Sequence, residues 1–202
     1  MANTPINTLE KSVKIYNPAA LYVTPFIRDT EKNTEVRGTK TYKLSEVIRE
    51  STTISQDDPT ENRVENEFSS APIINPTTLG SYTFSAEVAD MQPDLLEALC
   101  GYKKGKGKAD RVYAPANYTA IYAEIALVFN AGKNSEGEDT FVAAVIPKVQ
   151  LNSKATFDSL STSMGRITLA GTGLNISMAD GTDNPAIESP FYLDTNWSVN
   201  EL

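Results

Sequence analysis

The chain has 202 residues, with 18 basic and 26 acidic side chains, one cysteine and no histidine. Without histidine it forms neither a Ser-His-Asp triad nor a Cys-His pair, and a lone thiol supports neither a zinc site nor a disulfide framework. Hydrolytic, zinc-dependent and thiol redox enzymes are therefore disfavoured, and no cofactor is expected. About 200 residues fit a single hydrophobic core, so we expect one domain over residues 1–202.

The first fifty residues contain only weak β signals. The first twenty carry Glu10, Lys11 and Lys14 and no continuous apolar run, a pattern that indicates neither a signal peptide nor a membrane span. We therefore expect folding in the cytoplasm and no membrane partner. Short candidate strands lie at 12–16, 20–27 and 41–48.

Residues 50–76 form a long polar and acidic segment that is interrupted by Pro59, Pro72 and Pro76. A structureless insert of this length inside a compact domain is unusual unless it acts or folds on a partner. Over 63–68 charged residues alternate with Val64, Asn66 and Phe68, which indicates a projecting hairpin for part of the segment. We expect a long acidic loop or a projecting hairpin here.

Residues 81–90 give the clearest strand, because apolar and polar side chains alternate with the period expected when one sheet face is buried. The next segment, 93–100 (PDLLEALC), predicts the one firm helix. Pro93 suits the first helical position, Asp94 lies in the first turn, where the dipole favours an anion, and Gly101 follows the last residue. The expected buried face consists of Leu95, Leu96 and Leu99.

Two long and largely buried strands are predicted at 118–129 and 140–151, joined as a hairpin by the turn-forming segment 130–139. Pro147 has no N–H to donate, so the second strand is an edge there or bends at a bulge. The first strand places five apolar residues on one face: Ile121, Ala123, Ile125, Leu127 and Phe129. Later features are strands at 155–157 and 165–176, glycines at 165, 171 and 173 that mark bends or close packing, and an extended C-terminal segment at about 179–202. The chain is predicted to be mostly β.

The charge is distributed in blocks. Residues 51–102 carry nine acidic groups and one basic group, whereas 103–111 carry five basic groups and one acidic group. Such blocks let identical subunits attract head to tail, and solvated loops produce the same pattern, so both interpretations stay open. The candidates for subunit contacts are Asp57, Asp58, Glu61, Arg63, Glu65, Glu67, Lys103, Lys104, Lys106 and Lys108.

An overall acidic chain gains little from counterion release on a phosphate backbone, so tight DNA binding is disfavoured. The same charge suits a surface that nucleic acid passes without sticking.

No segment matches a specific catalytic or ligand-binding motif. The segment 101–108 (GYKKGKGK) superficially resembles a phosphate-binding loop but lacks the Walker spacing, so a solvated loop or a contact with an acidic neighbouring subunit is expected. The carboxylates of 57–67 lack EF-hand spacing. Cys100, at the end of an apolar helix face, is interpreted as a small buried hydrophobe.

The order of these features resembles the major tail tube proteins of long-tailed bacteriophages. The resemblance covers about residues 78–178 and rests on pattern. It consists of SYTFSAEVAD leading into PDLLEALCGY, the paired strands YTAIYAEIALVFN and TFVAAVIPKVQLNSKATF, and the late strand GRITLAGTGLNI.

The resemblance implies a non-enzymatic virion protein with a β-sandwich or barrel fold and one short flanking helix. Subunits of that family form rings, commonly of six, that stack into a tube through which DNA passes. The implied partners are the chain itself, other tail proteins such as the tape measure and tail terminator, and DNA transiently in the lumen. The implied location is the virion tail, after synthesis in the host cytoplasm, and the long acidic segment looks like the arms that reach adjacent subunits.

Three alternatives stay open. The first is the tube protein of a contractile injection system, such as type VI secretion, which is related in architecture. The second is a β-sandwich binding module, an adhesin or carbohydrate binder. An aromatic platform at Tyr113, Tyr118 and Tyr122 would favour it. The third is an enzyme that uses carboxylates alone, such as a glycosidase, with two carboxyl groups about 5 to 10 Å apart in one cleft.

Overall fold

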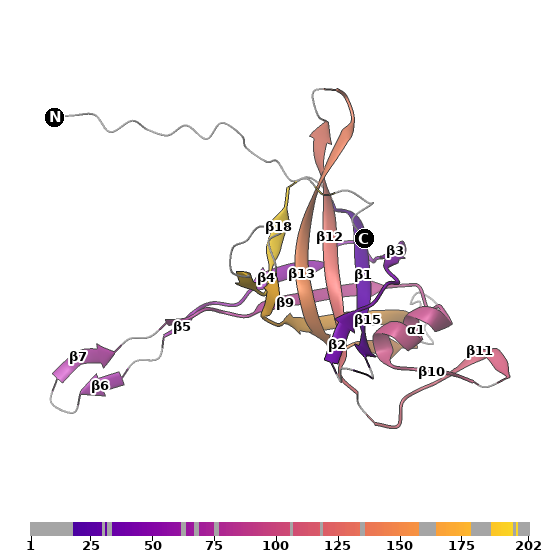
Figure 1. Cartoon of the computed structure of the whole chain (residues 1–202), viewed down its shortest axis with the longest axis horizontal. Helices are drawn as coiled ribbons and strands as arrows, with labels where there is room; N and C mark the ends of the chain where they lie inside the picture. Colours follow the sequence, from indigo (N-terminus) through magenta and orange to yellow (C-terminus); the bar gives the residue numbers. More distant parts are fainter. Residues whose placement is uncertain are drawn as a thin grey trace.

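A computed structural model shows a mostly β protein, with one short helix among the residues it describes (Figure 1). It describes residues 18–29, 31, 34–61, 64–66, 69–74, 77–105, 107–117, 119–133, 136–157, 165–178, 187–195 and 197. The predicted strand at 12–16 lies outside this part of the chain.

Ten strands form one antiparallel sheet that is folded into two layers. The main path runs β2-β1-β12-β13-β15-β9-β4, so the sheet is open, with β2 and β4 at its ends. In Figure 1 the strands of the first layer run across the direction of β4, β9 and β15. This arrangement confirms the predicted sandwich-like fold with a flanking helix.

The first layer contains β1 (Pro18–Asp29), β12 (Ile121–Lys133) and β13 (Asp139–Leu151), flanked by β2 (Thr34–Arg37), β3 (Tyr42–Leu44) and β18 (Tyr192–Asp194). The second layer contains β4 (Thr53–Gln56), β9 (Tyr82–Val88), β14 (Lys154–Thr156) and β15 (Arg166–Gly173). The shorter paired strands are β5 (Thr60–Glu61), β8 (Thr77–Thr78), β6 (Val64–Asn66), β7 (Ser69–Ile74), β10 (Lys103–Gly105), β11 (Lys108–Tyr113), β16 (Ile176–Met178) and β17 (Ile187–Ser189).

The predicted hairpin of two long strands is β12 and β13, and it carries a bulge at Pro147. Ala123 lies opposite Val149 while Ile125 lies opposite Ile146, so β13 holds one extra residue there. On its other edge β13 pairs with β18 before the proline and with β15 after it. The missing proline N–H therefore falls where the strand changes partner, which confirms the expected bulge.

Two glycines let β13 and β15 cross closely where one layer passes into the other. A Cβ atom added at Gly171 would lie 2.4 Å from the Gln150 carbonyl oxygen and 2.5 Å from a methyl carbon of Val149. At Gly173 it would lie 3.0 Å from a methyl carbon of Ile146. Since real Cβ atoms do not approach backbone this closely, only glycine permits this crossing at residue 171.

A strap, defined as residues 42–48, connects the two layers on another side. Leu44 in β3 pairs with Leu21 of β1. A few residues later the Ile48 N–H donates to the Glu87 carbonyl of β9 at 2.8 Å, and the Ala89 N–H donates to the Glu46 carbonyl at 2.8 Å. The predicted strand at 41–48 is thus divided between the two layers.

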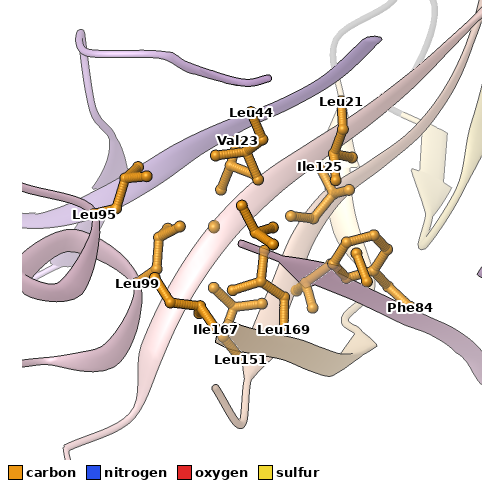
Figure 2. Packing of buried hydrophobic residues seen from close by; sticks show 14 of the residues in the cluster. Leu21, Val23, Leu44, Phe84, Leu95, Leu99, Ile125, Leu151, Ile167 and Leu169 are labelled. Carbon is orange, nitrogen blue, oxygen red and sulfur yellow. The ribbon is translucent and has the colours of Figure 1, made fainter. Parts of the chain in front are cut away.

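The main core lies between the layers and under the helix. Figure 2 shows side chains of both layers and of the helix pointing toward one another. The apolar face predicted for β12 is confirmed. Its members in the core cluster are Ala123, Ile125 and Leu127, with Ile121 and Phe129 packed against it.

The helix α1 (Pro93–Cys100) has the predicted bounds and buries the predicted leucines, Leu95, Leu96 and Leu99. Gly101 ends it in the left-handed conformation, with φ 72°, and its N–H bonds to the Leu96 carbonyl. The sequence signals at both ends of this helix act locally, which explains the agreement.

The C-terminal aromatic residues pack back onto the domain. Trp197 lies with its ring centroid 5.2 Å from that of Tyr22, on the outer face of the first layer. Phe191 stacks on Tyr82 at 4.7 Å. Both contacts favour docking within the chain over docking on a partner.

Replacing Gly171 by alanine is expected to lower the free energy of unfolding by about 1–3 kcal/mol, because the added methyl group collides with the Gln150 carbonyl. Denaturant unfolding followed by the fluorescence of Trp197, the only tryptophan, measures this loss. Gly165→Ala is the control, since its nearest atom would be 3.6 Å away. Equal losses in the two variants would contradict a special role for the crossing.

Candidate assembly surfaces

The acidic segment forms a two-stranded arm that continues β4 and β9 beyond the sandwich (Figure 1). Thr53 lies opposite Ser85, Thr60 opposite Thr78, and Val64 opposite Ile74. Equal numbers of residues separate these pairs on both strands, so Val64 and Ile74 still keep the register of the sheet, and two register shifts follow within β6 and β7. The predicted projecting hairpin is confirmed and extends over most of the segment.

We call residues 57–81 the acidic arm. Its base, where it leaves the sheet, carries two exposed carboxylates and an exposed leucine. Asp57 and Asp58 are exposed, and Leu79 is 77% exposed. The Asp57 N–H donates to the Ser81 carbonyl at 2.9 Å, which holds the two strands together at this point. Negative charge and apolar surface therefore lie together where the arm leaves the sheet.

The other acidic candidates lie farther out. Glu61 ends β5 and Glu65 lies in β6, so both belong to the arm. Arg63 and Glu67 lie outside the described residues. The arm thus brings four of the ten predicted contact residues, Asp57, Asp58, Glu61 and Glu65, into one projecting element.

The basic segment is a second projecting element, not the solvated loop expected from its glycines and lysines. β10 and β11 pair as a short hairpin, with Lys103 opposite Tyr113 and Lys104 opposite Val112. We call residues 103–113 the basic hairpin. Lys108 begins β11, and Lys106 lies outside the described residues.

One face of the basic hairpin is held against α1. Lys104 forms an ion pair with Asp94 and lies 3.7 Å from Glu97, both on the helix. Lys40 adds a second contact to Asp94 at 3.6 Å. Val112, the cross-strand neighbour of Lys104, packs on the main core.

These contacts shift the ionisation of the groups involved. The Lys104 ammonium lowers the pKa of Asp94 chiefly by hydrogen bonding, and the Asp94 carboxylate raises the pKa of Lys104 in the same way. A lowered carboxyl pKa adds stability above the ordinary pKa of an aspartate, and that contribution is lost as the pH falls through the lowered value. The attachment of the hairpin to α1 therefore weakens in acid.

The outer face of the first layer carries two ion pairs that the sequence did not indicate. Arg37 of β2 donates two hydrogen bonds to Glu124 of β12, at 2.7 and 2.8 Å. Lys148 at the β13 bulge lies 3.0 Å from Glu35 of β2. β2 is thus linked to β12 through its arginine and to β13 through its glutamate.

Two aromatic rings flank the Lys148 ammonium on this outer face. The nitrogen lies 4.7 Å from the Tyr122 ring centroid and 5.2 Å from that of Phe26. Tyr113 is instead exposed on the basic hairpin, and Tyr118 lies outside the described residues. Tyr113 and Tyr122 therefore lie on different elements in different surroundings, which does not favour the aromatic platform of a binding module.

Chemistry-bearing groups are sparse in the part of the chain that the structure describes. No three acidic, cysteine or histidine side chains come together there as a metal site. The described helix, α1, has eight residues, and no described helix has the length and hydropathy of a membrane span. Cys100 is half-buried, and desolvation raises the pKa of its thiol to about 11.

No protein-family model matches the sequence, and no curated protein matches it. A chain in the cryo-EM structure of the anti-feeding prophage (AFP) baseplate, 6-fold symmetrised, aligns with 91% of this chain and 97% of its own length. The sequence identity is 9% and the TM-score is 0.38. A likeness at this level establishes neither a common fold nor a common function, and nothing about this chain is inferred from it.

Native Cys100 is expected to react with a thiol-specific disulfide reagent at pH 8 at least about 10-fold more slowly than an unshifted thiol, because a pKa of about 11 in place of 9.0 lowers the thiolate fraction, an effect that the higher nucleophilicity of the more basic thiolate offsets only in part. Absorbance of the released chromophore follows the reaction. The same protein in denaturant provides the control and is expected to react fast. Rapid labelling of the folded protein would contradict the burial of this thiol.

The Arg37–Glu124 contact is expected to couple the two residues by about 0.5–1 kcal/mol, since a bidentate, partly buried pair exceeds a typical surface pair. A double-mutant cycle with Arg37→Met and Glu124→Gln measures this coupling in unfolding experiments. Arg49 and Glu50 form the control pair, because their side chains are 91% and 84% exposed and touch only at 3.5 Å. Similar coupling in both cycles would show that the bidentate geometry contributes nothing.

Proposed function

We propose that this chain is a non-enzymatic structural protein that self-assembles into rings, stacked as the tail tube of a bacteriophage and forming a conduit for DNA. The observation that supports this proposal best is the two-stranded arm that continues β4 and β9 away from the sandwich (Figure 1). The pattern resemblance to tail tube proteins supports it independently.

The arm has the properties of an element that acts on a partner. A two-stranded hairpin is marginally stable in water unless a third strand or another layer covers it. Its outer backbone groups are a template for pairing with another chain. An element of this kind is expected to gain its stability in an assembly.

The outer face of the first layer suits the wall of such a conduit. Two of its cations, Arg37 and Lys148, are each paired with a carboxylate of the same chain, whereas Lys43 lies exposed near the Tyr22 ring with no carboxylate partner among the described residues. Paired cations offer little counterion release to a phosphate backbone, so DNA gains little by binding there. We propose this face for the lumen.

The remaining parts of the proposal follow the resemblance. The partners are other copies of the chain and neighbouring tail proteins such as the tape measure and the tail terminator. The location is the virion tail. The tube of a contractile injection system has the same requirements, and a sheath that binds the outside of the tube would distinguish it.

Light scattering on size-exclusion fractions, followed by negative-stain electron microscopy at rising concentration, tests the proposal. Rings or hollow rods of uniform diameter are expected. A chain that stays monomeric at every concentration would contradict self-assembly and favour the binding module, which glycan and partner screening then tests. Glu46→Lys with Glu50→Lys, at two exposed positions outside the arm and the basic hairpin, is a control that changes the charge and is expected to assemble normally.

A further inference from the structure

We infer that the base of the acidic arm of one copy docks on the outer face of the basic hairpin of the next copy. This contact rests on the proposed self-assembly and specifies which surfaces meet. Asp57, Asp58 and Leu79 form the arm side. Lys103, Arg111 and Tyr113 form the hairpin side.

The two faces of the basic hairpin differ in how their charges are used. Lys104 and Val112, on the face toward α1, have their partners within the chain. Side chains alternate along a strand and cross-strand partners share a face, so Lys103 and its partner Tyr113 lie on the opposite face, and Arg111 precedes Val112 at the register shift of the hairpin. Lys103 and Arg111 are exposed and have no partner among the described residues, and Tyr113 is 55% exposed.

The base of the arm has the complementary composition. Asp57 and Asp58 are exposed, and their carboxylates have no partner among the described residues. Leu79 lies on the opposite strand of the arm, near these carboxylates, and is the most exposed large apolar side chain described. Each element therefore offers two unpaired charges of one sign beside one large apolar side chain.

The positions of the two elements suit a head-to-tail contact. In Figure 1 the arm and the basic hairpin project from opposite ends of the molecule along its longest axis. A contact between different surfaces of identical chains repeats from copy to copy, and it closes into a ring when the rotation allows. An arm-to-arm contact would bring like charges together.

Two variants, each blocked on one side, test this inference. The arm variant carries Asp57→Lys and Asp58→Lys, and the hairpin variant carries Lys103→Glu and Arg111→Glu. Each alone is expected to need at least about tenfold higher concentration to assemble, because the reversed charges repel the partner surface. Mixed together, the two variants are expected to assemble in alternation at about the wild-type concentration, because the intact arm meets the intact hairpin and the two reversed surfaces again carry opposite charges.

The chain that carries all four substitutions is expected to assemble again, because both surfaces are reversed together. Leu79→Ser tests the apolar half of the contact at unchanged charge and is expected to weaken assembly about tenfold. The charge-matched controls are Glu46→Lys with Glu50→Lys for the arm variant, and Arg49→Glu with Lys133→Glu for the hairpin variant. All four control positions are exposed.

Analytical ultracentrifugation gives the mass of each species, and circular dichroism checks that every variant is folded. A wild-type chain that stays monomeric overturns the proposed function and this contact with it. Wild-type assembly that neither variant weakens overturns only the contact, as does a mixture that assembles no better than either variant alone. Retention of a DNA duplex that only the hairpin variant loses, with assembly unchanged, would assign the hairpin to nucleic acid instead.

Discussion

The close crossing of β13 and β15 determines how the sheet of this protein is arranged in space. The two strands share a short ladder in which Val149 lies opposite Gly173 and Leu151 opposite Gly171. Because the glycines have no side chain, the backbones approach closely enough for the sheet to turn from one layer into the other. The facing layers then enclose the main core, and the direction of β9 in the second layer sets the direction in which the arm leaves.

Electrostatic contacts in this protein fall into two groups with different consequences. On the outer sheet face and beside α1, cations such as Arg37 and Lys104 are paired with carboxylates of the same chain, so they fix the position of β2 and of the basic hairpin. On the two projecting elements, Asp57, Asp58, Lys103 and Arg111 face solvent without a described partner. Paired charges stabilise the subunit, whereas unpaired charges on projections are available to other molecules.

Sequence reasoning succeeded where the signal is local or periodic. The helix at 93–100 was predicted to the residue because Pro93 and Gly101 act on the backbone within one turn. The faces of the long hairpin followed from a period of two. Reasoning failed for the basic hairpin, where glycine and lysine give little strand propensity, although Val112 has a core contact that stabilises the pairing. The pair of Arg37 and Glu124, 87 positions apart, left no pattern that sequence could show.

The sequence by itself determined the mostly β class, the single helix, the burial pattern of the long strands and the presence of oppositely charged segments, because each depends on residue type and short spacing. Tertiary structure alone decided which lysine of the basic segment is paired, that the acidic segment continues the register of β4 and β9, and that the two charged elements lie at opposite ends. These features depend on where distant segments meet, and that is set by the packing of the two layers around a shared core.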